Sequence, residues 1–260
     1  MITGWDAVDA ALAEVIATRR SALDRSILVG IAGAQGSGKS TMVPRLVHLL
    51  ELHGLRALGL ALDDFYLTKT ERIVLARSIH PLLATRGVPG THDVALVHGS
   101  LDALSRGNAK IQIPCFDKAA DDRVAVREVT PPFDVILLEG WCIGAMPQVP
   151  AALVEPVNAL ERNEDADGIW RHWVNDRLAG DYAALFVRLD LQIFLRAPNF
   201  AVVERWRGEQ EEQLHGDAMD RTQLRRFIDH YERITRATLA DHPANLTVDL
   251  DEQRRPQLRL

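Results

Sequence analysis

The residues best suited to chemistry are positions 33–40, which read G-A-Q-G-S-G-K-S and match the pattern GxxxxGK[ST] in full. In this pattern the glycines let backbone N–H groups wrap a phosphate, the lysine supplies charge at the β- and γ-phosphates, and the last hydroxyl faces Mg²⁺. Lys39 and Ser40 take the last two roles here. We therefore expect ATP and Mg²⁺ to bind, with nucleotide contacts from Gly33, Ala34, Gln35, Gly36, Ser37, Gly38, Lys39, Ser40 and Thr41.

The segments on either side of this motif have the character that a phosphate-binding loop requires. The apolar run 26–32 predicts a buried strand before it, and apolar residues at helical spacing from Met42 to Leu50 predict a helix after it. The N-terminus of such a helix favours a bound phosphate. Pro44 lies inside this helix, where proline removes a hydrogen bond, and no feature of the sequence explains it.

Two carboxylates that follow predicted strands are candidates for phosphoryl-transfer chemistry. Asp63, which begins Asp-Asp-Phe-Tyr directly after the strand 56–62, would accept a proton from an attacking hydroxyl or help hold Mg²⁺. Glu139 ends the apolar strand 133–138, where a second acidic group meets Mg²⁺ or its water. The structural alternatives are a helix cap formed by Asp63 and Asp64, and an ion pair between Glu139 and an arginine.

The loop 86–93, R-G-V-P-G-T-H-D, gathers cationic and hydrogen-bonding groups around two glycines. Such loops on a rigid scaffold often bind substrate, although Arg86 and His92 taken singly are ordinary loop residues. Asp117 and Lys118 follow another short predicted strand and are a weak signal alone.

The run E-R-W-R places Arg205 and Arg207 on a predicted helix. Two arginines would neutralise transferred phosphate when a lid closes. The alternative is a solvated helix on which both arginines pair with neighbouring glutamates.

Strands and helices alternate along the chain, which predicts one α/β domain over 1–260 with a largely parallel sheet covered on both faces. An N-terminal helix falls within 1–25, and a helical lid covers roughly 197–240. Strands are predicted at 26–32, 56–62, 110–114, 133–138, 191–195 and 246–250, and further helices at 68–78, 94–104, 200–214 and 221–239. Sites in such sheets lie beyond the carboxyl ends of the strands.

Composition narrows the classes of partner. The net charge is −6 with no long basic block, which argues against nucleic-acid binding. The apolar stretches are too short to span a membrane and no secretory signal is visible, so we expect a cytoplasmic protein, monomeric or homodimeric. Cys115 and Cys142 lie far apart without metal-ligand spacing and are expected to be reduced thiols.

Taken together, these motifs resemble the uridine kinase and phosphoribulokinase group of P-loop kinases, and within it the D-glycerate 3-kinase-like family. The matching runs are G-A-Q-G-S-G-K-S-T, L-D-D-F-Y-L-T, R-G-V-P-G-T-H-D, P-C-F-D-K, V-I-L-L-E-G-W and E-R-W-R-G-E-Q-E, in order over residues 26–215. Very many NTPases share the first run, whereas the second and third together are far more specific. After Lys118 the chain runs directly through 119–123, where plant-type members have a longer Gly-rich segment.

The resemblance implies a P-loop NTPase three-layer sandwich whose parallel strands have the order 2-3-1-4-5. It implies that Asp63 acts on the acceptor hydroxyl and that Glu139 lies near Mg²⁺. The expected catalytic residues are Lys39, Asp63, Glu139, Arg205 and Arg207, and the expected metal contacts are Ser40, Asp63 and Glu139. The acceptor is expected among Asp63, Tyr66, Arg86, His92, Asp93, Asp117 and Lys118.

These features predict an Mg²⁺- and ATP-dependent kinase for a small hydroxylated acid, with conversion of D-glycerate to 3-phosphoglycerate as the leading hypothesis. A nucleoside or pantothenate-like acceptor is the alternative within the same class. The alternative from another class of protein is a nucleotide-dependent switch that acts on a protein partner. Such a switch would hydrolyse NTP without any acceptor.

Overall fold

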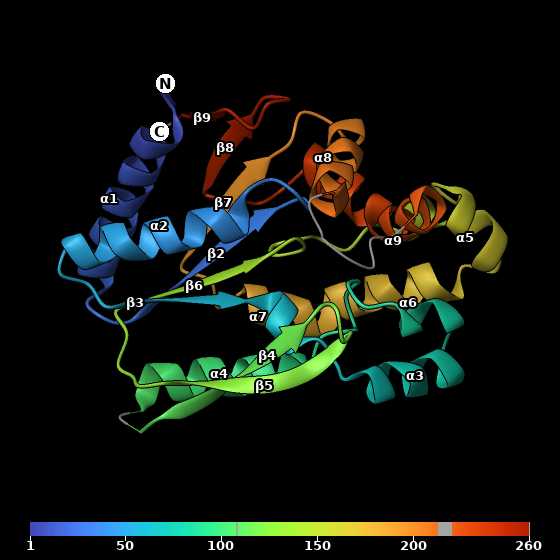
Figure 1. Cartoon of the computed structure of the whole chain (residues 1–260), viewed down its shortest axis with the longest axis horizontal. Coiled ribbons are helices and arrows are strands. Elements are labelled where there is room, and N and C mark those ends of the chain that lie inside the picture. Colours follow the sequence, from blue (N-terminus) through green and yellow to red (C-terminus); the bar gives the residue numbers. More distant parts are fainter. Residues whose placement is uncertain (108, 213–219, 260) are drawn as a thin grey trace.

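A seven-stranded sheet with helices on both faces organises the part of the chain that the computed structural model describes, residues 1–107, 109–212 and 220–259 (Figure 1). Five of its strands are parallel. They are, in spatial order, β3 (Ala57–Ala61), β6 (Val135–Gly140), β2 (Ile27–Gly33), β7 (Leu191–Arg196) and β8 (Leu246–Leu250). Counted along the chain this is the order 2-3-1-4-5. β9 (Pro256–Leu258) and β1 (Ile2–Thr3) extend the β8 edge in antiparallel fashion.

Strand β2 lies at the centre because every one of its residues can be buried. Successive side chains of a strand point to opposite faces, so Val29 and Ile31 enter one hydrophobic core while Leu28 and Ala32 enter the other. This two-sided burial explains the continuous apolar run in the sequence.

Helices cover both faces of the sheet (Figure 1). One face carries α1 (Trp5–Leu23), α2 (Lys39–Leu52) and α8 (Phe200–Glu212), and the other carries α4 (Val94–Arg106), α6 (Ile169–Arg177) and α7 (Ala183–Phe186). A π-helical turn, Leu178–Tyr182, joins α6 to α7. The remaining helices are α3 (Lys69–Ser78), α5 (Ala159–Glu164) and α9 (Arg221–Ala240), and α9 contributes to both cores. No described helix is long and apolar enough to cross a membrane.

The predicted helices are present with small shifts at their ends. Asp93 caps α4, with its Oδ1 accepting from the Leu96 amide at 2.9 Å. The end of the predicted helix 200–214 lies outside the described residues. Pro44 lies on the exposed side of α2, which continues unbroken through it. Because proline has no N–H, the carbonyl of Ser40 loses its helical hydrogen bond, and Ser40 is also an exposed residue.

The segment predicted as a strand at 110–114 does not join the main sheet. It forms β4 (Ile111–Asp117), which pairs with β5 (Asp122–Val129) in a separate antiparallel hairpin. Only residues 118–121 connect the two strands, and so short a link permits antiparallel pairing alone. This turn, named the hairpin turn below, places Lys118 and Asp121 at the end of the hairpin.

Candidate active site

The phosphate-binding loop connects β2 to α2, as the motif predicts. Gly36 has a φ of 76°, and a Cβ there would lie 2.7 Å from Cβ of Trp206, so both the backbone and the close approach require glycine. Gly38, with a φ of 96°, is the N-cap of α2. The first amides of a helix have no acceptor within it, which leaves those after Gly38 available to a phosphate.

Lys39 and Ser40 begin α2 and meet Glu139 from the neighbouring strand. The Lys39 side chain is buried and its Nζ donates to the Ala34 carbonyl at 3.2 Å. Burial lowers the pKa of Lys39, although the charges of Glu139 and Asp63 act in the opposite direction. Ser40 Oγ donates to Glu139 Oε1 at 2.6 Å, and burial raises the pKa of Glu139 against the effects of Lys39 and Ser40.

Two of the three predicted Mg²⁺ contacts, Ser40 and Glu139, meet at this point, whereas the third, Asp63, contacts Lys118 and Tyr66. Ser40 and Glu139 present a hydroxyl and a carboxylate, both oxygen donors of the kind that Mg²⁺ prefers. Among the described residues, no group of three or more His, Cys, Asp or Glu side chains could hold a metal ion. Mg²⁺ usually takes only one or two protein carboxylates and completes its shell with water and phosphate, so the small donor set fits this ion.

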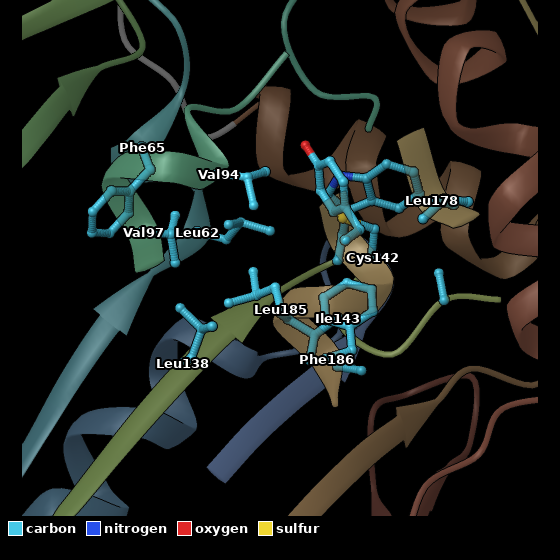
Figure 2. Close-up of a cluster of buried hydrophobic side chains, with 14 of the residues drawn as sticks. Leu62, Phe65, Val94, Val97, Leu138, Cys142, Ile143, Leu178, Leu185 and Phe186 are labelled. Carbon is cyan, nitrogen blue, oxygen red and sulfur yellow. The ribbon is translucent and has the colours of Figure 1, made fainter. Parts of the chain in front are cut away.

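Asp63 is held at the carboxyl edge of the sheet by buried neighbours. A 3₁₀ turn, Leu62–Phe65, follows β3, and both of its end residues are fully buried. Leu62 and Phe65 belong to the same core as Val94 and Val97 of α4 (Figure 2). Because β3 pairs with β6, this turn lies beside the strand end that carries Glu139. Asp63 and Glu139 therefore come to one edge, as predicted.

The Asp63 carboxylate is contacted on both oxygens. Lys118 Nζ lies 2.8 Å from Oδ2, and the Tyr66 hydroxyl donates to Oδ1 at 2.9 Å. Burial favours the protonated form, but Lys118, His92 and the Tyr66 hydrogen bond outweigh it, so the pKa of Asp63 is lowered. Asp63 is therefore ionised at neutral pH.

The structural alternative for the aspartate pair, a helix cap, does not hold. Thr68 caps α3 in a capping box with Glu71. Asp64 instead accepts from the Phe116 amide at 3.2 Å, which fastens the β4–β5 hairpin to the end of β3, and burial raises its pKa. The two neighbouring aspartates thus differ in their surroundings.

His92 is buried beneath Tyr66, with the two rings stacked 4.4 Å apart. The Tyr182 hydroxyl accepts from the Gly90 amide at 2.9 Å and lies 2.6 Å from His92 Nδ1. Nδ1 is the acceptor that the described contacts offer to the phenolic hydrogen, so we infer that Tyr182 donates to Nδ1 and that the neutral imidazole carries its proton on Nε2. Burial lowers the pKa of His92 to about 4, so the ring is neutral. Its Nε2 has no hydrogen-bond partner in the described part of the chain.

Of the other residues predicted to bind the acceptor, some lie at the site and some hold its loops in place. Arg86 pairs with Asp121 of the hairpin turn, and its carbonyl accepts from the Tyr231 hydroxyl at 3.1 Å. Asp93 is engaged in capping α4. Asp117 accepts from the Ala119 amide of its own turn at 2.8 Å. Both aspartates therefore shape the loops that carry Arg86, His92 and Lys118.

The two arginines of α8 lie in different surroundings. Arg205 donates to the Glu252 carbonyl at 2.9 Å and lies 3.2 Å from its carboxylate, so it is held by the C-terminal turn. Arg207 lies over the Phe227 ring at 5.3 Å, and its charge acts on the buried Tyr231 hydroxyl. Of the pair, Arg207 is the one whose charge acts on Tyr231, which donates to the carbonyl of Arg86.

Several contributing residues carry no local signal in the sequence. Arg254 reaches back from the C-terminal turn, and its Nε donates to the Gly36 carbonyl at 2.7 Å. Tyr182 lies 90 residues beyond His92 in sequence. Arg72 lies on α3, in a stretch that reads only as an amphipathic surface helix, yet it is fully buried. Contacts between such distant segments depend on the folded chain, and single-sequence patterns do not report them.

Comparison with known proteins identifies the relatives of this site. No profile of a described protein family matches the chain. It is 31% identical over 253 residues to an uncharacterized kinase of Schizosaccharomyces pombe (mug58), covering 89% of this chain and 90% of that protein. It is 30% identical over 258 residues to the chloroplastic D-glycerate 3-kinase of Arabidopsis thaliana, covering 89% of this chain but 54% of the plant protein. The structure of D-glycerate 3-kinase from Cryptococcus neoformans shares the fold, with a TM-score of 0.81 over 97% of this chain and 99% of that one, at 24% identity.

A probable ATP-dependent kinase of Saccharomyces cerevisiae (TDA10) is 30% identical, with 88% of this chain and 86% of that protein covered. These similarities extend over the whole site, from the phosphate-binding loop to α8. The chain therefore belongs to the D-glycerate 3-kinase-like family of P-loop kinases and is an ATP-dependent phosphotransferase.

Proposed function

We propose that this kinase transfers the γ-phosphoryl group of ATP to a hydroxyl of a small carboxylic acid, with D-glycerate as acceptor and 3-phosphoglycerate as product. The observation that carries the proposal is the ionised Asp63 carboxylate, which lies between Lys118 and Tyr66 at the strand edge it shares with Glu139. The named activity of the Arabidopsis relative supports the choice of acceptor.

In this proposal Lys39 and the loop amides hold the triphosphate, and Ser40 and Glu139 hold Mg²⁺ directly or through water. When bound, the ion neutralises charge on the β- and γ-phosphate oxygens. Asp63 accepts the hydrogen bond of the acceptor hydroxyl and aims its oxygen in line with the γ-phosphorus. The new O–P bond forms as the bond to the ADP oxygen breaks, and Asp63 takes the released proton.

The lowered pKa of Asp63 makes it a weak base, which suits this reaction. Phosphoryl transfer passes through a loose transition state in which the hydroxyl keeps its proton until late, so orientation contributes more than early proton removal. The neutral His92 ring offers its Nε2–H to an oxygen of the acceptor molecule and adds no charge to the site.

An ADP-release assay over D-glycerate, other hydroxy acids, nucleosides and pantothenate tests the proposal. We expect D-glycerate to give the highest kcat/KM, with release abolished in Lys39→Ala. A nucleoside or pantothenate that exceeds D-glycerate would reassign the acceptor. ADP release that needs no acceptor and survives Asp63→Asn would instead support an NTPase switch and exclude this mechanism.

A further inference from the structure

The hairpin turn places two opposite charges on two parts of the candidate acceptor site. Lys118 Nζ contacts the Asp63 carboxylate at 2.8 Å. Three residues further on, the Asp121 carboxylate contacts both Arg72 and Arg86. A single four-residue turn therefore supplies a cation to the proposed base and an anion to a pair of arginines.

The arginine pair is built into the framework of the protein. Arg72 is fully buried, and its Nη2 donates to the Asp121 carboxylate at 2.6 Å and to the Asp121 carbonyl at 2.8 Å. Arg86 comes from the loop 86–93 and donates to the other carboxylate oxygen. Both guanidinium groups lie over the Phe116 ring, at 5.7 and 5.4 Å. Two fixed guanidinium groups that converge on one carboxylate form a binding site for that group.

The hydrogen bonds of this pair are incompletely satisfied. Both arginines contact one carboxylate, that of Asp121, although the charge of Asp122 also acts on Arg72. Arg72 Nε and Nη1 are buried and have no hydrogen-bond partner among the described residues. Asp122 Oδ1 accepts from the Lys69 and Arg123 amides and makes no hydrogen bond to these two nitrogens. Buried donors without partners are costly, so Asp121 satisfies Arg72 only in part.

Asp121, in contrast, lies where it can move away from the two arginines. Its side chain is 31% exposed, and its φ of 54° lies in the left-handed region, which non-glycine residues adopt at a cost. Lys118, the other charged group of the turn, is 66% exposed. The arginines are anchored while the groups that cover them lie on a short surface turn.

We propose that Arg72 and Arg86 form the carboxylate-binding site of the acceptor, and that Asp121 occupies this site as an internal competitor. This rests on the proposed function, and it assigns the substrate class as hydroxy acids whose carboxylate replaces that of Asp121. The hairpin turn then moves outward when the acceptor binds. Lys118 separates from Asp63, and the acceptor hydroxyl takes the place of Lys118. Acceptors without a carboxylate do not displace Asp121.

The decisive variant is Asp121→Asn, assayed by ADP release with D-glycerate against wild type. If Asp121 covers the site for about nine-tenths of the time, removing its charge lowers KM about tenfold and leaves kcat within about twofold. Glu128→Gln is the matched control, because it removes an exposed charge from the same hairpin, paired only with Lys110. An unchanged or higher KM in Asp121→Asn would mean that Asp121 only orients the arginines, and would overturn the proposal.

A second measurement does not depend on how much of a variant folds. The ratio of kcat/KM for D-glycerate to that for glycerol, which lacks the carboxylate, is the same for any amount of active enzyme. We expect this ratio to fall at least about tenfold in Arg72→Gln and in Arg86→Gln, since each loses a charged hydrogen bond. Arg86→Gln decides the matter if Arg72→Gln is inactive, and an unchanged ratio would overturn the proposal.

Failure of this proposal differs from failure of the proposed function. If wild type releases no ADP with D-glycerate or any other hydroxy acid, the function itself is wrong. If wild type turns over D-glycerate but Asp121→Asn leaves KM unchanged, only the carboxylate site is wrong.

Discussion

The nucleotide half and the acceptor half of this site are built in different ways. The nucleotide half comes from one continuous stretch, the end of β2 and the start of α2, together with the neighbouring strand end that carries Glu139. The acceptor half is assembled from α3, the loop 86–93, the hairpin turn, the π-helical turn and α9. The first half is centred on the local geometry of one loop, to which Glu139 and Arg254 are added from distant segments, whereas the second consists throughout of contacts between distant segments. Changes to the acceptor half should therefore alter turnover while nucleotide binding survives.

The largest expected effect comes from Lys39→Ala, which acts on the nucleotide half. Losing the buried ammonium removes charge stabilisation at the transferred phosphate, so kcat/KM should fall by about a thousandfold or more and nucleotide binding should weaken. Steady-state kinetics and titration calorimetry with ATP measure both. Lys110→Ala, which changes an exposed lysine just before β4, is the matched control. Wild-type ATP affinity and turnover in Lys39→Ala would contradict the assignment.

Asp63→Asn should separate the two halves most cleanly. The variant keeps the side-chain shape but loses the proton acceptor, so kcat should fall about a hundred- to a thousandfold while the Kd for ATP stays within about twofold. Kinetics and calorimetry on the same preparation give both numbers. Asp64→Asn, next to it in sequence but bonded to the hairpin backbone, should keep most of the turnover. Equal losses in both variants would argue for a structural role of the pair.

Acid should destabilise the protein through histidines that are buried and neutral. Burial lowers the pKa of His92 and of His230 to about 4 each. The unfolded chain binds these protons near pH 6.5 and the folded chain only near pH 4, so stability is lost as pH falls between these values. Urea unfolding at pH 7 and 4.5 measures the loss in the free energy of unfolding. Between these pH values, His230→Gln should lose about 2–3 kcal/mol less than wild type. His48→Gln, at an exposed position of α2, should leave the loss unchanged.

The smallest effect is expected from Tyr182→Phe, which removes one hydroxyl from the acceptor half. Without it, Nδ1 of His92 and the Gly90 amide lose their partner. We expect kcat/KM for the acceptor to fall about tenfold with unchanged ATP affinity, the usual cost of one buried hydrogen bond. ¹⁵N NMR of the His92 ring distinguishes positioning from packing, because wild type should show the Nε2–H tautomer and the variant a mixture. A pure Nε2–H signal in the variant would contradict the role given to Tyr182.

The sequence predicted the two halves unequally for the same physical reason. The phosphate-binding loop, Asp63 and Glu139 are each marked by a strand that ends in a polar residue, a pattern read over fewer than ten positions. Arg72 and Asp121, by contrast, lie 49 residues apart and meet only because the β4–β5 hairpin folds against α3. Such a hairpin, partly exposed on both faces, gives a weak periodic signal. Arg205 is likewise held by Glu252, nearly fifty residues later, a contact that no local pattern reports.

The most direct test of the account is to follow the γ-phosphate by ³¹P NMR in wild type with MgATP and D-glycerate. The account predicts that ADP and 3-phosphoglycerate appear in equal amounts, and that both appear at least about a hundredfold more slowly when Asp63→Asn replaces wild type. Release of inorganic phosphate in place of a phosphorylated acid, at the same rate with and without D-glycerate, would contradict it.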